Sequence, residues 1–390
     1  MYVPVYQGLT PADFFRTTRN EPACFPFDHP SRLYFYRARN AIYHLFRELQ
    51  ANVGPMIVLA PDYNSGNEVL AMQAAGATLK YFPVGRDMQL DPLEVERLCE
   101  RHRPDVLYVI HYAGWPQPMA PLVDLCRRWG MLLVEDCALA LLSDVDGRPL
   151  GSFGDWSIFC LYKTLPLPNG AALVQNSGRL DALDRLALRR PSTPSVVGRT
   201  AELMVQRLRS RSDAAGSLLQ RVKRGLGRAA NAMEVRRANV GDIGFNLEDV
   251  DLAISALSER VLARLDFDAI RRRRAQNFRR LARRLAGRAT LVHTDLPDGV
   301  CPLFLPILVP DKHAAATALQ ARGVDALEFW NDAVDVPGGE RSDTERFLRA
   351  HVLELPIHQD LTDRHLDFVA EQVGALNLMM HDVVETVHAA

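Results

Sequence analysis

Short apolar segments alternate with helical segments between about residue 40 and residue 176, and this alternation constrains the fold most. Brief apolar runs predict buried strands at residues 56–61, 78–84, 106–112, 132–137, 157–162 and 171–175. Apolar residues at helical spacing predict helices at residues 40–50, 68–76, 92–102 and 119–130. Continuous apolar strands separated by helices are typical of an α/β fold, with a mostly parallel sheet covered on both faces.

The rest of the chain follows other patterns. Residues 178–240 are rich in arginine with amphipathic helical spacing, and we interpret them as an insertion packed on its own domain. The alternative is a surface for a membrane or an acidic partner. Residues 249–285 predict one long connector helix. Further segments predict a smaller α+β domain, with strands at 290–295, 301–309 and 352–357 and helices at 313–323 and 364–385. We therefore expect a large domain over 1–248 and a small one over 249–390.

Composition excludes several classes of protein. The net charge of −1 provides no whole-chain electrostatic attraction for nucleic acid or a membrane. No apolar run approaches the roughly 18 residues of a membrane span, and the first residues lack the pattern of a secretory signal. The six cysteines are scattered without zinc-site spacing, so no metal site is expected, and reduced thiols in the cytoplasm fit best. No glycine-rich nucleotide-binding motif is present.

Lysine is the exception in this chain. Of 46 Lys and Arg residues, only four are lysine, namely Lys80, Lys163, Lys223 and Lys312. Arginine stays charged in proteins, whereas a buried lysine can lose its proton and act as a nucleophilic amine. Lys163 follows a predicted strand and precedes a stiff proline-containing turn, so a chemical role is the hypothesis for this residue.

Other polar residues are expected at the same edge of the sheet, because ligands bind at the carboxyl ends of strands in open α/β folds. Asp136 ends the strand at 132–137, where its carboxylate can pair with a protonated ring nitrogen. A plain salt bridge with Lys163 is the alternative. The helix that begins near Arg39 is suited to a phosphate. His111 ends another strand and either approaches a ligand or is a satisfied strand-end histidine.

This order of a helix N-terminus, polar turn, aspartate and lysine is that of fold-type I enzymes that use pyridoxal 5′-phosphate (PLP). The sequence resembles the DegT/DnrJ/EryC1/StrS family of sugar aminotransferases. The resemblance rests on RARNAIYHL, LAPDYNSGNEVLAMQAAGA, IHYAGWPQPM, LLVEDCALAL, GRPLGSFGDWSIFCLYKTLPLPNGAALV, DIGFNLEDVDLAISAL and LELPIHQDLT. It implies an aspartate-aminotransferase-like fold with a seven-stranded type of sheet, and a homodimer whose active sites are shared across the interface.

The resemblance also implies roles for single residues. Lys163 matches the lysine that forms the Schiff base, and Asp136 matches the partner of the pyridinium nitrogen. Ala38 and Arg39 fall where the family binds the cofactor phosphate. Asn246 matches an asparagine that reaches into the neighbouring subunit's phosphate site.

Several positions depart from the family pattern. Leu139 stands where Gln or His usually faces the cofactor ring, and Cys160 replaces a phosphate-binding serine. Glu248 replaces an arginine. Ser65 occupies the place of the stacking aromatic ring, with Tyr63 and Asn64 as the alternatives for cofactor contact.

Three residues of the predicted small domain are further candidates, namely Trp330, Asn331 and His358. They are expected either to face substrate or, as we favour, to pack between the domains.

The expected activity is transfer of an amino group from an amino acid, probably glutamate, to a keto group of a nucleotide-linked ketosugar. Two alternatives stay open. One is a different PLP reaction on a non-sugar substrate, which the altered pocket positions favour. The other is a non-catalytic homologue that acts as a binding partner.

Overall fold

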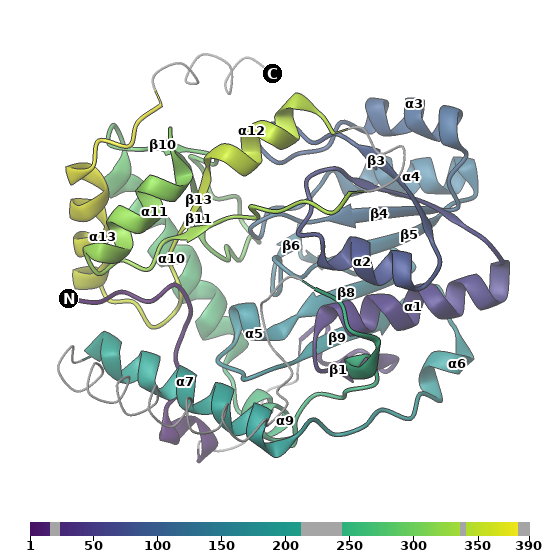
Figure 1. Ribbon diagram of the computed structural model, residues 1–390, viewed down its shortest axis with the longest axis horizontal. Coiled ribbons are helices and arrows are strands. Elements are labelled where there is room, and N and C mark those ends of the chain that lie inside the picture. The colour runs from purple at the N-terminus through teal and green to yellow at the C-terminus, as the bar shows by residue number, and fades with distance from the viewer. Residues whose placement is uncertain (16–23, 212–243, 336–340, 381–390) are drawn as a thin grey trace.

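Two sheets organise the chain in the computed structural model, which describes residues 1–15, 24–211, 244–335 and 341–380 (Figure 1). The larger sheet has seven strands in the order β1-β9-β8-β5-β4-β2-β3. Its strands are β1 (Arg32–Phe35), β2 (Ile57–Pro61), β3 (Thr78–Phe82), β4 (Val106–Ile110), β5 (Leu132–Asp136), β8 (Trp156–Cys160) and β9 (Ala171–Gln175). The central strands β3, β2, β4, β5 and β8 run parallel, and β9 and β1 each run antiparallel to their neighbours. The predicted mostly parallel α/β sheet is confirmed.

Helices separate the parallel strands, as the apolar periodicity predicts. They are α1 (Ala38–Val53), α2 (Asn67–Ala74), α3 (Pro92–His102) and α4 (Met119–Trp129), and the short α6 (Asp181–Asp184) follows β9. Local sequence sets their ends. The Asp91 side chain accepts a hydrogen bond from the Leu93 N–H (2.9 Å) before α3, and Pro92 is the first residue of that helix. Gly130 ends α4 with φ of 67°, a conformation that favours glycine.

The smaller sheet is antiparallel throughout, in the order β10-β11-β13-β12. Its strands are β10 (Thr290–Leu291), β11 (Leu305–Leu308), β12 (Leu327–Glu328) and β13 (Val352–Leu355). The accompanying helices are α11 (Lys312–Ala321), α12 (Asp343–His351) and α13 (Asp363–Ala375). The helix expected at 364–385 therefore ends earlier, at Ala375, and residues 381–385 lie outside the described residues. Minor elements are η1 (Pro11–Phe14), η2 (Leu247–Asp249), β6 (Asp144–Val145) and β7 (Arg148–Pro149).

Two expected elements differ from the structure. The connector over 249–285 is not one helix but two, α9 (Ala256–Leu262) and α10 (Phe267–Leu285). The break falls at Asp266, whose side chain accepts a hydrogen bond from the Ala269 N–H (2.8 Å) and so begins a new helix. The strand expected at 157–162 stops at Cys160. Lys163 lies on the following single turn, α5 (Leu161–Thr164).

The arginine-rich segment contains one long described helix, α7 (Thr193–Arg211). Leu203 on this helix is buried, and its carbonyl accepts a hydrogen bond from the Leu9 N–H (3.3 Å). Arg207 forms an ion pair with Asp360 (2.8 Å). The contact with Leu9 lies within the predicted large domain, but Asp360 belongs to the predicted small domain, so α7 does not pack on its own domain alone. Residues 212–240 lie outside the described residues. No helix in the described ranges is both long and apolar enough to cross a membrane.

Arg274, a buried residue of α10, ties the two sheets together. Its guanidinium donates hydrogen bonds to Gln359 (2.9 Å), to the Leu303 carbonyl (2.8 Å) and to Gln7 (2.9 Å). A further hydrogen bond reaches the carbonyl of Thr164 (3.2 Å) on α5. One side chain therefore connects the small sheet, the N-terminal segment and the turn that carries the exceptional lysine.

Candidate active site

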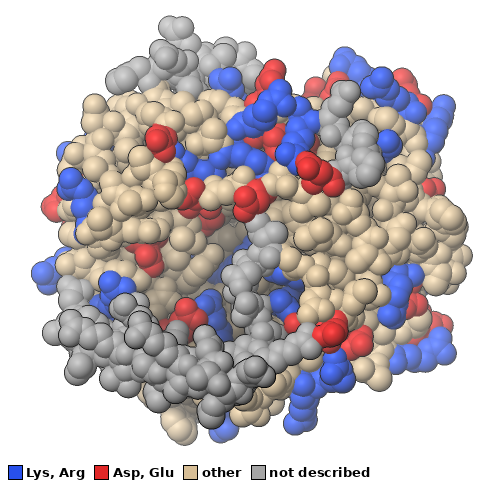
Figure 2. Space-filling model, in the orientation of Figure 1, with Lys and Arg blue, Asp and Glu red and all other residues tan. Residues whose placement is uncertain are grey.

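A cavity of about 750 Å³ opens where the two sheets meet. The large sheet contributes the C-terminal end of β5, together with α5 and the N-terminus of α1, and the small sheet contributes β12 and β13. Helix α7 forms another wall. The molecule is hollowed at the centre of the face shown in Figure 2, with acidic side chains gathered beside the hollow. The position at the carboxyl ends of parallel strands is where open α/β folds bind ligands.

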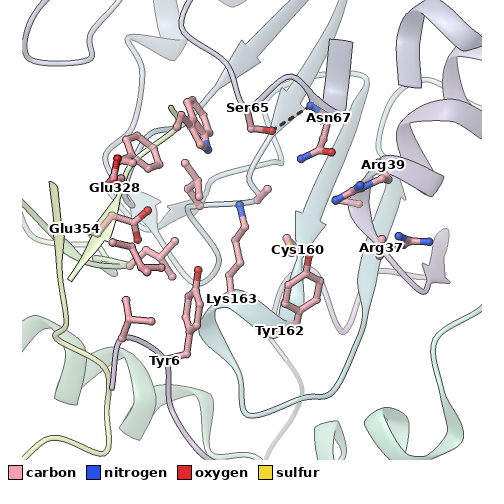
Figure 3. A pocket seen from close by; sticks show the side chains of 18 of the residues that line it. Tyr6, Arg37, Arg39, Ser65, Asn67, Cys160, Tyr162, Lys163, Glu328 and Glu354 are labelled. Atoms are coloured by element: carbon pink, nitrogen blue, oxygen red, sulfur yellow. Dashed lines mark hydrogen bonds between the residues drawn. The ribbon is translucent and has the colours of Figure 1, made fainter. Parts of the chain in front are cut away.

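Lys163 points its amine into this cavity (Figure 3). The short helix α5 turns the chain away from β8, and the hydrogen bond from the Leu161 N–H to the Gly170 carbonyl (2.9 Å) holds its start. The Gln7 amide donates to the Lys163 carbonyl (3.4 Å). The lysine backbone is thus held on both sides, while its side chain is half-buried and faces the open space.

Asp136 ends β5 and lines the same cavity. Its carboxylate accepts hydrogen bonds from the Tyr108 hydroxyl (2.6 Å) and from the Ala138 N–H (2.8 Å). Burial, and then the nearby charge of Glu68, raise the pKa of Asp136 to about 6, against the lowering effects of the two hydrogen bonds and of Lys163. The group is mainly a carboxylate at neutral pH and can pair with a cationic ring nitrogen.

The N-terminus of α1 forms one end of the cavity, where Ala38 and Arg39 line it. Arg37 is the residue before the helix, and its side chain makes no capping hydrogen bond to the first N–H groups of α1. Its guanidinium instead pairs with Asp249 (3.1 Å). Cys160 also lines the cavity, and burial raises the pKa of its thiol. Helix N–H groups and two arginines favour an anion here.

The turn after β2 contributes only one of its three candidates to the cavity. Ser65 lines it, and its N–H (2.7 Å) and hydroxyl both donate to the Glu68 carboxylate. Tyr63 is fully buried outside the lining, and its ring packs against Trp330 (5.2 Å between centroids). Asn64 is likewise buried, because its amide bonds the backbone of the turn. The expectation that Tyr63 or Asn64 replaces the stacking ring is not supported.

His111 is a satisfied strand-end histidine and does not line the cavity. Its Nε2 lies 3.1 Å from the Glu135 carboxylate, and its Nδ1 accepts a hydrogen bond from the Gln117 N–H (3.1 Å). The Glu135 carboxylate also accepts hydrogen bonds from three backbone N–H groups, that of Gly151 (2.9 Å) and those of two later residues. His111, Glu135 and Cys137 place ligand-type atoms within 4.8 Å of one another, but these hydrogen bonds already explain the first two.

The remaining candidates divide between cavity, surface and packing positions. Leu139, Trp330 and Asn331 line the cavity. His358 does not: it is buried, and its Nε2 lies 3.0 Å from the Pro4 carbonyl, in agreement with a packing role. Asn246 is exposed outside the cavity and caps η2 by accepting the Glu248 N–H (3.0 Å). A role of Asn246 in the phosphate site of a partner subunit stays a prediction.

Several lining residues were not expected from the sequence. Glu354 on β13, Tyr6 in the N-terminal segment and the charged face of α7 with Arg199 and Arg209 all reach the cavity. A signal existed for Glu354, because it is a lone charge in the apolar strand at 352–357. No local pattern marks Tyr6, since the long-range fold of the N-terminal segment brings it to the cavity.

Comparison with known proteins gives the wider context. Over 123 residues the chain is 30% identical to GDP-perosamine synthase of Vibrio cholerae, which covers 31% of this chain and 33% of the relative. It is 42% identical over 52 residues to dTDP-4-dehydro-2,3,6-trideoxy-D-glucose 4-aminotransferase of Saccharopolyspora spinosa, covering 13% of this chain and 14% of the relative. The chain thus matches about a third or less of the length of these curated relatives.

Solved structures match almost the whole fold. The putative sugar aminotransferase Spr1654 of Streptococcus pneumoniae, in its PLP form, has a TM-score of 0.66 at 14% identity, covering 97% of this chain and 99% of that one. PseC of Helicobacter pylori has a TM-score of 0.64 at 15% identity, also covering 97% and 99%. The model of one protein family matches residues 51–374. By that match, the chain belongs to the DegT/DnrJ/EryC1/StrS aminotransferase family.

Proposed function

We propose that this protein is a PLP-dependent aminotransferase. The observation that carries the proposal is the convergence of Lys163, Asp136 and the N-terminus of α1 on one cavity. This arrangement matches the three groups that a phosphorylated pyridine aldehyde needs, namely an amine, a carboxylate for the ring nitrogen and an anion site. Membership of the aminotransferase family supports the same activity.

The residues present fit this cofactor. Asp136 would hold the ring nitrogen, because hydrogen bonds keep its carboxylate in place and largely ionised at neutral pH. Ala38 and Arg39 would hold the phosphate at the start of α1. Cys160 supplies only a weak donor there. When bound, PLP supplies an electron sink that stabilises negative charge at the substrate carbon.

Lys163 would act as the proton carrier of the reaction. Among the described lining residues it is the only one with an amine side chain. Its Nζ would take the proton from the α-carbon of the amino donor and later return a proton to the carbon that receives the amino group. The hydrogen bond from Gln7 to the Lys163 carbonyl holds the backbone while the side chain moves.

The finer parts of the proposal concern substrates, assembly and location. Glutamate is the proposed donor and a nucleotide-linked ketosugar the proposed acceptor, supported by the names of the relatives from Vibrio cholerae and Saccharopolyspora spinosa. We also propose a homodimer with shared sites, in which the exposed Asn246 reaches the partner, and a cytoplasmic location, which six free cysteines favour.

An absorption experiment tests the activity. Purified protein is mixed with PLP, and its visible spectrum is recorded before and after glutamate is added. We expect a yellow band that glutamate bleaches, and no such lysine-dependent band in Lys163→Ala. Lys80→Ala, a change in β3 outside the cavity lining, is the control and should keep the band. A wild-type protein that forms no band would refute the proposal.

Mixing variants tests the shared site. If Asn246 serves the partner subunit, Asn246→Ala should be weakly active and Lys163→Ala inactive, whereas each mixed dimer should contain one intact site. Random mixing in equal amounts makes about half of the dimers mixed, so the mixture should regain about a quarter of the wild-type activity. A monomer in sedimentation would refute the homodimer.

A further inference from the structure

Glu354 is a largely buried residue on the small-sheet side of the cavity, and its carboxyl group opens onto that cavity. It is 9% exposed and lines the cavity, yet no hydrogen bond or ion pair joins its side chain to another residue in the described ranges. Successive side chains of a strand point to opposite faces, so Leu353 and Leu355 lie on the other face of β13. Leu327, its register partner on β12, lines the cavity beside it.

The charged residues of the cavity wall differ from one side to the other. Every charged residue that the small-sheet side contributes to the described lining is acidic, namely Asp325, Glu328, Asp332 and Glu354. The rest of the described lining carries both signs, with Arg37, Arg39, Lys163, Arg199 and Arg209 beside Glu68, Asp136 and Glu202. A substrate therefore meets arginines at the start of α1, and the small-sheet side offers it only carboxyl groups among the charged residues of the described lining.

Glu354 differs from the other acidic groups of this wall because none of the described residues forms a hydrogen bond or ion pair with its side chain. Asp325 accepts a hydrogen bond from the Tyr2 hydroxyl (2.7 Å). Glu328 is contacted by Asn331 (2.8 Å) and by His313 (2.9 Å), and Asp332 is exposed at the mouth. Because its carboxyl group faces the cavity and is not engaged by a described residue, Glu354 is the position in this wall that is available to hydrogen-bond a ligand.

We infer that Glu354 binds an ammonium group of the substrate, one that is not transferred, so that the proposed aminotransferase acts on a substrate that already carries an amine. This inference rests on the proposed function and narrows its substrate class to aminated compounds, such as amino sugars or diamines. In Figure 3 the Glu354 carboxyl group faces the space in front of Lys163, where the reacting carbon would lie. The bound ammonium would therefore lie beside the reaction centre.

The protonation of Glu354 agrees with this role. Burial raises its pKa to about 8, while Lys163 on α5 and Lys312 on α11 act in the opposite direction. Tyr6 and Tyr63 are the other titratable groups that face it, and of these Tyr63 is buried and Tyr6 half-buried. Lys312 donates to the Phe329 carbonyl (3.0 Å), and burial lowers its pKa to about 8. At neutral pH the Glu354 carboxyl group is therefore mainly protonated, and binding of a cation would displace that proton.

Calorimetry on the full chain tests the inference with a matched pair of probes, putrescine and 1,4-butanediol. The measurements are made on the protein alone and on protein loaded with pyridoxamine 5′-phosphate, which has no aldehyde to react with an amine. We expect putrescine to bind at least about tenfold more tightly than the diol, because a charge-assisted hydrogen bond replaces an unsatisfied carboxyl group. Repeating the titration in buffers of different ionisation enthalpy at pH 7 should show release of about one proton.

The variant Glu354→Gln has the same shape and no charge. It should lose both the putrescine preference and the proton release, whereas Asp367→Asn, an exposed change on α13 outside the cavity lining, should keep both. Equal binding of the two probes, or putrescine binding without proton release in the wild-type protein, would overturn the inference even if the variant fails to fold.

The two proposals fail in distinguishable ways. A protein that shows the lysine-dependent band but no preference for putrescine retains the proposed function and loses this inference. A protein that prefers putrescine through Glu354 but forms no band with PLP keeps the ammonium site and loses the aminotransferase proposal.

Discussion

The large and small sheets each place one buried carboxyl group on the cavity wall, and they treat it in opposite ways. Asp136 on β5 receives hydrogen bonds from Tyr108 and from the Ala138 N–H, and its pKa is raised only to about 6. Glu354 on β13 receives none from the described residues, and its pKa is raised to about 8. The large sheet holds its carboxylate charged and oriented in advance, whereas the small sheet leaves its carboxyl group for a ligand to satisfy.

The largest expected effect comes from removing the charge on the large-sheet side. Asp136→Asn keeps the shape of the side chain but cannot neutralise a cationic ring nitrogen, so single-turnover amine transfer should slow by about a hundredfold or more. Asp124→Asn, an exposed change on α4, is the control. A rate within twofold of wild type would contradict the proposed difference between a charged Asp136 and a protonated Glu354.

The next test removes the link between the two regions. Arg274→Met leaves the Leu303 carbonyl and the Gln7 side-chain oxygen without the hydrogen bonds that Arg274 donates, and should lower the free energy of unfolding by about 3 kcal/mol in urea titrations. Arg273→Met, which loses one hydrogen bond to the Leu361 carbonyl, should cost less than about 1 kcal/mol. Equal costs would mean that burial of the guanidinium does not matter.

Much of the fold was predictable from the sequence, and the misses have physical causes. The bounds of α3 agree with the prediction because proline, an aspartate cap and apolar spacing all act locally. Apolar runs identify strands but not their direction, so the reversal at β9 could not be foreseen. The break before α10 was missed, although Asp266 is a capping residue, because the apolar spacing continues across it.

The site was predictable where a single residue is recognisable in the sequence by its type or its position. Lys163 stands out in an arginine-rich chain, and Asp136 ends a clear strand. The face of β13 that Glu354 occupies depends on how the small sheet packs, which the sequence does not state. Tyr63 and Asn64 were placed in the cavity by their position in a turn, whereas packing against Trp330 decides where the Tyr63 ring lies.

A smaller effect should appear in the pH dependence of stability. The folded-state pKa of Glu354 is about 8, above its ordinary value of 4.5, so the folded protein binds the extra proton. The stability that this proton provides is complete below about pH 4.5 and is lost as the pH rises to about 8. Between pH 5.5 and 7.5, wild type should lose about 2 kcal/mol relative to Glu354→Gln. Urea unfolding at both pH values measures this, and parallel pH profiles would contradict the comparison.

The smallest expected effect concerns the support of Asp136. Tyr108→Phe removes a hydrogen bond that lowers the pKa of Asp136, so the acidic limb of the amine-transfer profile should move to higher pH. The loss corresponds to about 1 kcal/mol, or roughly fivefold in rate near that limb. Tyr34→Phe on β1, whose hydroxyl accepts from Arg32 (3.1 Å), is the control. An unmoved limb would indicate that another group titrates there.

The position of Arg274 has a mechanical consequence. Its guanidinium donates hydrogen bonds to Gln359 and the Leu303 carbonyl on the small-sheet side. It also donates to the Thr164 carbonyl on the large-sheet side, so these bonds span the junction at which the two sheets would separate. A wide hinge opening would break buried charged contacts beside Lys163 itself. Helix α7 is held in a different way, by the burial of Leu203 and by the ion pair of Arg207 with Asp360, and no described contact of α7 is a buried guanidinium like that of Arg274. We therefore expect substrate to enter the cavity by a displacement of α7 and not by separation of the two sheets.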